Sequence, residues 1–214
     1  MNNEVSIFFY GDSNLYGIEA VTYKRYSSKD RFSNIVIEQL KKEFTKVNCI
    51  VDGKPARSLK YENIPFGITN GLKDYDQFLL KITSNPFSTN KVLILALCIN
   101  DILSKATSQQ VIDALQQYIE KVQKQTKIII LIPPPLQYCT FDSWKSTVNP
   151  VISESLNFIH QLKVVVEMWK KQEIIDGFVD LDGMSVGADG VHFTSDSHHK
   201  IAEKLLSILH DVLN

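Results

Sequence analysis

The segment Gly11-Asp12-Ser13-Asn14-Leu15-Tyr16-Gly17 lies directly after the first predicted strand, and its position there is the main indication of the fold class. It follows Val5-Ser6-Ile7-Phe8-Phe9-Tyr10, an apolar and β-prone run that predicts a buried strand. A strand that ends at this segment places Ser13 at its carboxyl end, which is the edge where ligands bind in an open α/β sheet. Ser13 is therefore a helix cap, a phosphate-loop residue or a nucleophile, and the rest of the chain has to decide.

Strand and helix patterns alternate through the rest of the chain. Further strands are predicted at 47–51, 91–97, 127–132 and 178–181, and helices at 32–44, 73–83, 108–125, 151–171 and 195–213. Strands that are apolar throughout indicate a parallel sheet covered on both faces. We predict a three-layer α/β/α fold with a five-stranded parallel sheet in the flavodoxin-like order 2-1-3-4-5. In that order the loops at Ser13 and Asn100 flank one crevice.

The bulk composition narrows the classes of protein. A chain of 214 residues that is 44% hydrophobic suits a single domain over 1–214. The net charge of −1, with scattered Lys and Arg, predicts no nucleic-acid partner. No apolar run approaches the roughly 20 residues of a membrane span. The first residues lack the pattern of a signal peptide, so we expect a cytoplasmic protein.

The cysteines suggest neither a metal site nor a disulfide framework. Cys49, Cys98 and Cys139 are odd in number and widely spaced. We expect buried free thiols in a reducing compartment.

Four loops with reactive or hydrogen-bonding residues follow predicted strands or precede the last helix. They contain Ser13, Gly53, Asn100 and Asp189-Gly190-Val191-His192. Serine, aspartate and histidine in this chain order can form a nucleophile, an orienting acid and a base. An aspartate three residues before His192 keeps its carboxylate near Nδ1, which leaves Nε2 free to take the proton of Ser13. The flanks of Ser13 do not read Gly-x-Ser-x-Gly, so this is not the nucleophile elbow of α/β-hydrolases.

Taken together, these blocks resemble the SGNH (GDSL-type) hydrolase family. They occur in order as Gly11-Asp12-Ser13, Gly53, Asn100-Asp101 and Asp189-x-x-His192. The chain is also similar to an arylesterase and acyltransferase-like branch, and the resemblance covers essentially the whole chain. The segments that fit this branch are Asp52-Gly53 with Ala56-Arg57-Ser58 (compare Gly-x-x-x-Arg-Thr), Asn70-Gly71-Leu72, the prolines after the fourth strand, and Asp189-Gly190-Val191-His192-Phe193.

The resemblance implies a role for each of these residues. Ser13 is the nucleophile, His192 is the general base and then acid, and Asp189 orients His192. The oxyanion hole comprises the backbone N–H groups of Ser13 and Gly53 and the side-chain amide of Asn100. Fixed donors at the developing negative charge contribute about 10²–10³ in rate each, and Gly53 lets the backbone approach the substrate. We therefore expect a serine esterase acting on small acetyl, short-chain or aryl esters, with no metal or cofactor.

Other interpretations stay open at this point. An acyltransferase or a carbohydrate or lysolipid deacylase of the same family fits the same residues. A flavin-binding protein of flavodoxin type, with phosphate held by the loop after the first strand, is an alternative from another class. A catalytically silent binding module is a third, because Cys98 stands where the family usually has glycine and would strain the loop at a positive φ. The oligomeric state is also open, and a homo-oligomer is one alternative.

The remaining polar and aromatic residues receive structural interpretations. We expect Asp12 and Asp101 to brace their loops and Arg57 to donate to backbone carbonyls. We expect Pro133–Pro135 to stiffen a wall of the crevice. The loops 14–30 and 54–90 are expected to shape the pocket with Tyr16, Tyr23, Tyr26, Tyr61, Phe66 and Tyr75. The histidines predicted to be solvated are His160, His198, His199 and His210.

Overall fold

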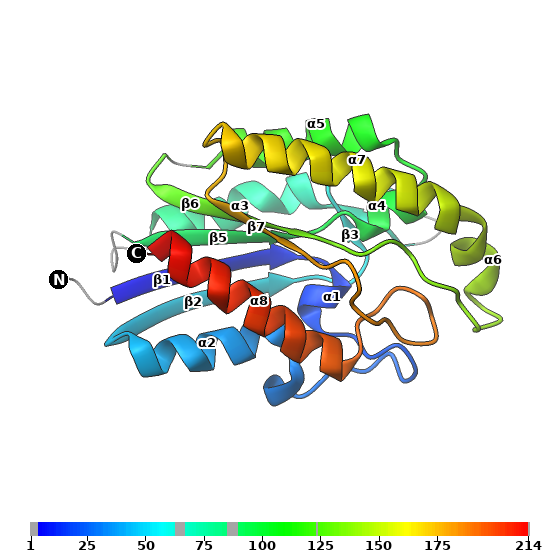
Figure 1. Ribbon diagram of the computed structural model, residues 1–214, viewed down its shortest axis with the longest axis horizontal. Helices are drawn as coiled ribbons and strands as arrows, with labels where there is room; N and C mark the ends of the chain where they lie inside the picture. Colours follow the sequence, from blue (N-terminus) through cyan, green and yellow to red (C-terminus); the bar gives the residue numbers. More distant parts are fainter. Residues whose placement is uncertain (1–3, 63–66, 85–89, 123, 214) are drawn as a thin grey trace.

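A five-stranded parallel sheet forms the centre of the molecule, with the order β2-β1-β5-β6-β7 (Figure 1). The computed structural model describes residues 4–62, 67–84, 90–122 and 124–213. The strands are β1 (Glu4–Gly11), β2 (Lys46–Gly53), β5 (Lys91–Ala96), β6 (Thr126–Ile132) and β7 (Gly177–Asp180). Numbered along the chain, this order is 2-1-3-4-5, so the predicted fold class and strand order are confirmed.

Helices cover both faces of the sheet (Figure 1). Helices α3, α5 and α7 pack on one face, and α2 and α8 pack together on the other. They span α2 (Phe32–Glu43), α3 (Gly71–Thr83), α5 (Ser108–Glu120), α7 (Ile152–Lys171) and α8 (Ser195–Leu213). The predicted helices are all present, although α5 ends at Glu120 rather than at 125.

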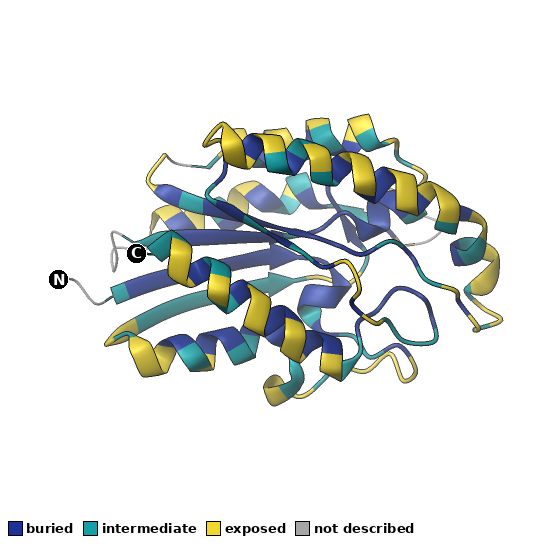
Figure 2. Ribbon diagram, viewed as in Figure 1, coloured by how far each residue is buried: buried dark blue, intermediate teal, exposed yellow. Residues whose placement is uncertain are grey.

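The side chains of β1 show why its sequence is apolar throughout. Successive residues of a strand point to opposite faces of the sheet. Phe8 and Tyr10 belong to the core beneath α3, α5 and α7, whereas Ile7 and Phe9 belong to the core beneath α2 and α8. Figure 2 shows the result, with β1 buried inside the molecule and the exposed residues on the outer faces of the helices. A strand buried on both faces therefore carries no polar alternation.

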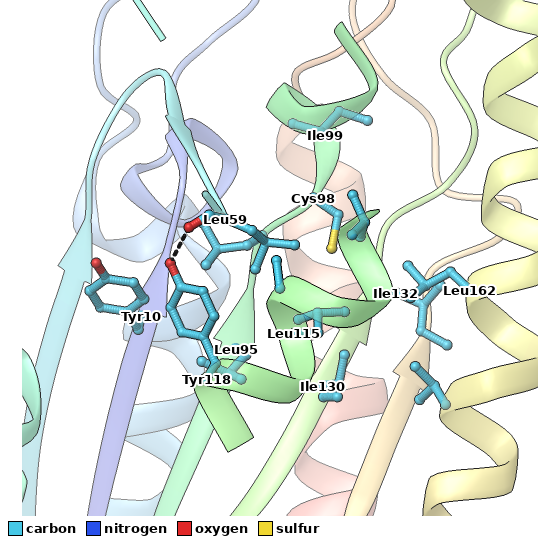
Figure 3. Packing of buried hydrophobic residues seen from close by; sticks show 14 of the residues in the cluster. Tyr10, Leu59, Leu95, Cys98, Ile99, Leu115, Tyr118, Ile130, Ile132 and Leu162 are labelled. Atoms are coloured by element: carbon cyan, nitrogen blue, oxygen red, sulfur yellow. Dashed lines mark hydrogen bonds between the residues drawn. The ribbon is translucent and has the colours of Figure 1, made fainter. Parts of the chain in front are cut away.

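Tyrosines in the first of these cores also hold the connection that follows β2. The Tyr118 hydroxyl donates to the Leu59 carbonyl at 2.7 Å (Figure 3). The Tyr10 hydroxyl donates to the Gly71 carbonyl at 2.6 Å. A buried tyrosine needs such a partner for its hydroxyl, so these bonds fix the backbone near the site and satisfy the core at the same time.

Several short elements were not predicted. They are α1 (Ser13–Tyr16), α4 (Ile99–Leu103), α6 (Lys145–Val148), the turns η1 (Ser28–Asp30) and η3 (Asn149–Val151), and a two-stranded parallel sheet of β3 (Arg57–Ser58) and β4 (Thr69–Asn70). The cysteine prediction needs one correction. Cys98 and Cys139 are buried and free, but Cys49 is only half-buried because β2 is an edge strand.

The parallel strands bring their carboxyl ends to one edge of the sheet. In the register of the sheet, Gly11 pairs with Gly53 of β2 and with Ala96 of β5. Helix α1 follows β1 at this edge and α4 follows β5, so Ser13 and Asn100 lie on neighbouring loops. None of the helices formed by the described residues is long and apolar enough to cross a membrane.

Candidate active site

Ser13, His192 and Asp189 form a hydrogen-bonded series at the carboxyl edge of the sheet. The Ser13 Oγ lies 2.9 Å from His192 Nε2, although 179 positions separate the two residues. His192 Nδ1 lies 2.5 Å from Asp189 Oδ2. All three side chains are buried. A carboxylate only accepts hydrogen bonds, so a neutral imidazole that donates from Nδ1 to Asp189 leaves Nε2 to accept from Ser13.

The loop that carries Asp189 and His192 is closed by the same aspartate. Asp189 Oδ1 accepts from the backbone N–H groups of Val191 and His192, both at 3.0 Å. Gly190, which lies between Asp189 and Val191, has a φ of +74°, a conformation that residues with a Cβ rarely adopt. One carboxylate therefore shapes the turn with its first oxygen and contacts the imidazole with its second.

Gly53 stands at the end of β2 against the backbone of α1. A Cβ at this position would lie 2.5 Å from the backbone nitrogen of Tyr16. Only glycine fits so close an approach of two backbones. Gly53 lies beside the segment that carries Ser13, but it is not among the residues that line the cavity described below.

Asn100 lies near the start of α4 and lines the same cavity as Ser13 and His192. Its side-chain Nδ2 donates to the backbone carbonyl of Arg57 at 2.9 Å. A carboxamide nitrogen carries two N–H groups. One of them donates to the Arg57 carbonyl, and the other has no hydrogen-bond acceptor among the described residues.

Arg57 joins the ends of two strands. Its Nη1 donates to the carbonyls of Gly11 and Asp52 at 2.9 and 2.8 Å, and its Nη2 donates to the Asp52 carboxylate at 2.8 Å. The guanidinium also lies 4.1 Å from the centroid of the Tyr10 ring. The side chain is only 2% exposed. The prediction that Arg57 anchors backbone carbonyls is confirmed.

Cys98 does occupy the left-handed region, with a φ of +106°. This is the conformation in which a side chain was expected to strain the loop. The loop still presents Asn100 to the cavity. Burial raises the pKa of the Cys98 thiol well above its usual range, with Asp101 and Asp12 adding to the effect, so the thiol stays protonated and packs in the core.

Both aspartates with predicted structural roles accept backbone hydrogen bonds. Asp12 caps α1 by accepting from Asn14 N at 2.9 Å, and burial raises its pKa to about 6. Both carboxylate oxygens of Asp101 accept from Leu59 N, at 3.1 and 2.9 Å, and burial raises its pKa to about 7. These contacts confirm that the two residues brace their loops.

A cavity of about 330 Å³ opens beside Ser13 and His192. Its walls are mainly apolar and include Ile18, Tyr23, Ile68, Leu103, Trp144 and Val191. The rings of Tyr23 and Trp144 lie 6.4 and 6.2 Å from the imidazole of His192. Among the described residues that line the cavity there is no lysine, arginine, aspartate or glutamate.

The predicted aromatic wall is only partly correct. Tyr23 lines the cavity, but Tyr75 is buried in the core and Tyr16 stacks on Arg25 instead. Tyr26 packs on His198, Tyr61 reaches the carbonyl of Gln110, and Phe66 lies outside the described residues. Pro133 borders a separate cavity of about 20 Å³ rather than the crevice.

Trp144 also lines the cavity and was not predicted from the sequence. It follows the proline run after β6 and therefore belongs to a loop at the same sheet edge as Ser13. An aromatic residue in a loop at this edge was the available signal.

His198 corrects the prediction that all the helical histidines outside the site are solvated. His160, His199 and His210 are exposed, but His198 is completely buried. Burial lowers its pKa to about 4, with the neighbouring His199 and Arg31 acting in the same direction. Its position three residues before Ile201, on the buried face of α8, was the missed signal.

Within the described ranges, no three histidine, cysteine, aspartate or glutamate side chains gather as a metal site.

The fold matches solved structures along nearly their whole length. The native aryl esterase of M. smegmatis aligns with a TM-score of 0.79 and 19% identity, over 98% of this chain and 100% of that chain. A carbohydrate acetylesterase family member from Sinorhizobium meliloti aligns at 0.76 and 18%, over 98% and 99%. A member of the lipolytic G-D-S-L family from Veillonella parvula aligns at 0.63 and 20%, over 96% and 98%. The fold is that of the SGNH hydrolases.

The sequence identifies the family. The family model of the GDSL-like lipase/acylhydrolases matches residues 7–205, and the chain belongs to this family of hydrolases. No curated protein matches the chain.

Proposed function

We propose that this hydrolase is a serine esterase that cleaves small uncharged acyl esters through an acyl-Ser13 intermediate. The observation that carries the proposal is the series Ser13–His192–Asp189, with its contacts of 2.9 and 2.5 Å. A serine hydroxyl is a weak nucleophile at neutral pH unless an adjacent base takes its proton. Membership of a hydrolase family favours this function over a flavin carrier or a silent binding module.

The proposed reaction has two halves. His192 Nε2 takes the hydroxyl proton as Ser13 Oγ attacks the ester carbonyl carbon, and the resulting imidazolium then protonates the departing alcohol. Water enters, gives its proton to His192 and attacks the acyl carbon, and the proton returns to Ser13 as the acid leaves. Asp189 holds the imidazole in the required tautomer and stabilises its positive charge.

Three donors are proposed for the oxyanion of the tetrahedral intermediates. They are the backbone N–H groups of Ser13 and Gly53 and the free N–H of the Asn100 amide. The location of Asn100 on the cavity wall and the close approach of Gly53 to α1 support this assignment. Such donors act where the negative charge develops, which is why they lower the barrier.

The apolar lining supports an uncharged substrate, because a carboxylate or phosphate in the cavity would meet no lysine or arginine from the described residues. Two of the matched structures are an aryl esterase and a carbohydrate acetylesterase family member, so aryl esters and acetylated sugars are the first substrates to test. A panel of acyl chain lengths, sugar esters and lysolipids, with and without an added alcohol, separates hydrolysis from acyl transfer.

The test of the mechanism uses p-nitrophenyl acetate and Ser13→Ala. We expect the wild type to hydrolyse the ester and the variant to lose on the order of 10⁶ in kcat, as is typical for loss of the nucleophile of a triad. A fluorophosphonate should add one adduct mass to the wild type and none to the variant. Wild-type activity in Ser13→Ala would show that the mechanism is wrong.

A further inference from the structure

Asn14 directly follows Ser13, and its side chain is hydrogen-bonded to both neighbours of His192. Its side-chain Nδ2 donates to the Val191 carbonyl at 3.3 Å, and its Oδ1 accepts from the Phe193 backbone N–H at 3.0 Å. The side chain is buried, and its own backbone N–H is held by Asp12. One carboxamide therefore pairs with the backbone on both sides of His192.

The other backbone bonds of the loop 187–192 are made within the loop or to the segment after β6. In that segment Gln137 N donates to the Gly190 carbonyl at 3.0 Å, and Thr140 N donates to the Ala188 carbonyl at 2.9 Å. The His192 N–H donates to Asp189, and the His192 carbonyl accepts from Gly187 N at 2.8 Å. These bonds shape the loop and tie it to the segment after β6, but none of them joins it to α1. Asn14 lies on α1 directly after Ser13, so its two bonds set the distance between this loop and α1.

We propose that Asn14 is a positioning residue that fixes His192 Nε2 at hydrogen-bonding distance from Ser13 Oγ. This inference rests on the proposed function, because it assumes that the proton of Ser13 passes to His192. A misplacement of about 1 Å between reacting groups can reduce a rate on the order of 100-fold. The side chain needs no contact with substrate for this role.

Two substitutions separate positioning from general stability. Asn14→Leu keeps the branching at Cγ and removes both bonds. Asn14→Asp keeps the acceptor for Phe193 N–H but places a second oxygen against the Val191 carbonyl. The added carboxylate also favours the protonated imidazole, so only this variant should move the acid limb of the pH profile to higher pH.

Asn149 offers a chemically matched control. Its Oδ1 accepts from Cys139 N at 2.8 Å and its Nδ2 donates to the Cys139 carbonyl at 3.0 Å, so it makes the same pair of backbone bonds. Cys139 carries no reacting group in the proposed mechanism. Asn149→Leu therefore reports the loss of a two-bond carboxamide contact in the segment that meets the histidine loop away from α1.

The experiment measures the rate of Ser13 labelling by a fluorophosphonate, together with melting temperature and the pH profile of kcat/KM. We expect both Asn14 variants to be labelled about 10- to 100-fold more slowly than the wild type. We expect Asn149→Leu, with a similar decrease in melting temperature, to be labelled within about threefold of the wild-type rate. Labelling at the wild-type rate in a folded Asn14 variant, or an equal loss in Asn149→Leu, overturns the inference. Failure of the proposed function is seen separately, as a wild type that is not labelled at Ser13.

Discussion

The backbone carbonyl of Arg57 accepts a hydrogen bond of 2.9 Å from the side-chain amide of Asn100. The guanidinium of the same arginine donates to the carbonyls of Gly11 and Asp52, which stand directly before the segments that carry Ser13 and Gly53. Ser13 lies two residues after Gly11, Gly53 directly follows Asp52, and Asn100 is bonded to Arg57 itself. Arg57 therefore holds backbone close to all three proposed oxyanion donors. This relationship leads to the first prediction.

Arg57→Lys should lower kcat on p-nitrophenyl acetate and leave KM nearly unchanged. A lysine cannot reproduce the planar fork that reaches two carbonyls and a carboxylate. Because loss of a whole oxyanion donor costs about 10²–10³ in rate, partial displacement should cost about tenfold or more. Lys54→Met, which removes a surface pair with Asp74, serves as the control and should keep kcat. An unchanged kcat in Arg57→Lys would contradict the prediction.

Asp189→Asn should reduce kcat on the order of 10³–10⁴-fold while the loop keeps its shape. The amide oxygen can still accept from Val191 and His192, as Asp189 Oδ1 does now. The amide nitrogen, however, donates to Nδ1 and so stabilises the tautomer with its proton on Nε2, which cannot take the proton of Ser13. Steady-state kinetics at the pH optimum, with circular dichroism as the check on folding, tests this. A loss below tenfold would argue against Asp189 as the orienting acid.

Trp144→Ala should change the preference for aryl over alkyl esters more than it changes kcat. The indole lines the cavity beside His192, and a contact with an aromatic group contributes about 0.5–1.5 kcal/mol. We expect the ratio of kcat/KM for phenyl acetate over ethyl acetate to fall about two- to tenfold. Tyr138→Ala is the matched control, because Tyr138 is 72% exposed and outside the cavity. Equal ratios in the two variants would rule out this role of Trp144.

His198 should make the fold sensitive to acid. Burial lowers its pKa from the usual 6.5 to about 4, so between these values the unfolded chain binds a proton that the folded chain does not. The contribution of neutral His198 to stability is therefore complete above pH 6.5 and declines as the pH falls toward 4.

The measurement is the free energy of unfolding in urea at several pH values. His198→Phe should lose less stability than the wild type between pH 6.5 and 4.5. His160→Gln, at an exposed position on α7, should follow the wild type. Parallel curves for His198→Phe and the wild type would show that His198 does not contribute in this range.

Cys98→Gly should be more stable than Cys98→Ala by about 1 kcal/mol. Both variants remove the buried thiol, so their difference isolates the cost of a Cβ at a φ of +106°. Urea unfolding of the pair at one pH provides the comparison. An alanine variant at least as stable as the glycine variant would mean that the loop accepts a side chain without strain.

Elements with a strong local pattern could be predicted from the sequence. The apolar run before Ser13 predicts a strand buried on both faces, and the apolar periodicity of 195–213 predicts a helix whose bounds the structure reproduces. His198 shows the limit of this reasoning. Its polar neighbours suggested exposure, whereas its place on the helix face that includes Ile201 and Leu205 decided its burial.

The amino-acid sequence alone determined the order of the strands along the chain, their apolar character and the residue types at their carboxyl ends. The tertiary structure decided which of those residues meet. The 2.9 Å contact between Ser13 and His192 depends on strand pairing and on the Asn14 bonds, neither of which follows from local preference. The wall formed by Trp144 likewise depends on where a loop after β6 folds back. Local sequence fixes backbone preference and side-chain direction, but distances between remote residues come from packing of the whole sheet and its helices.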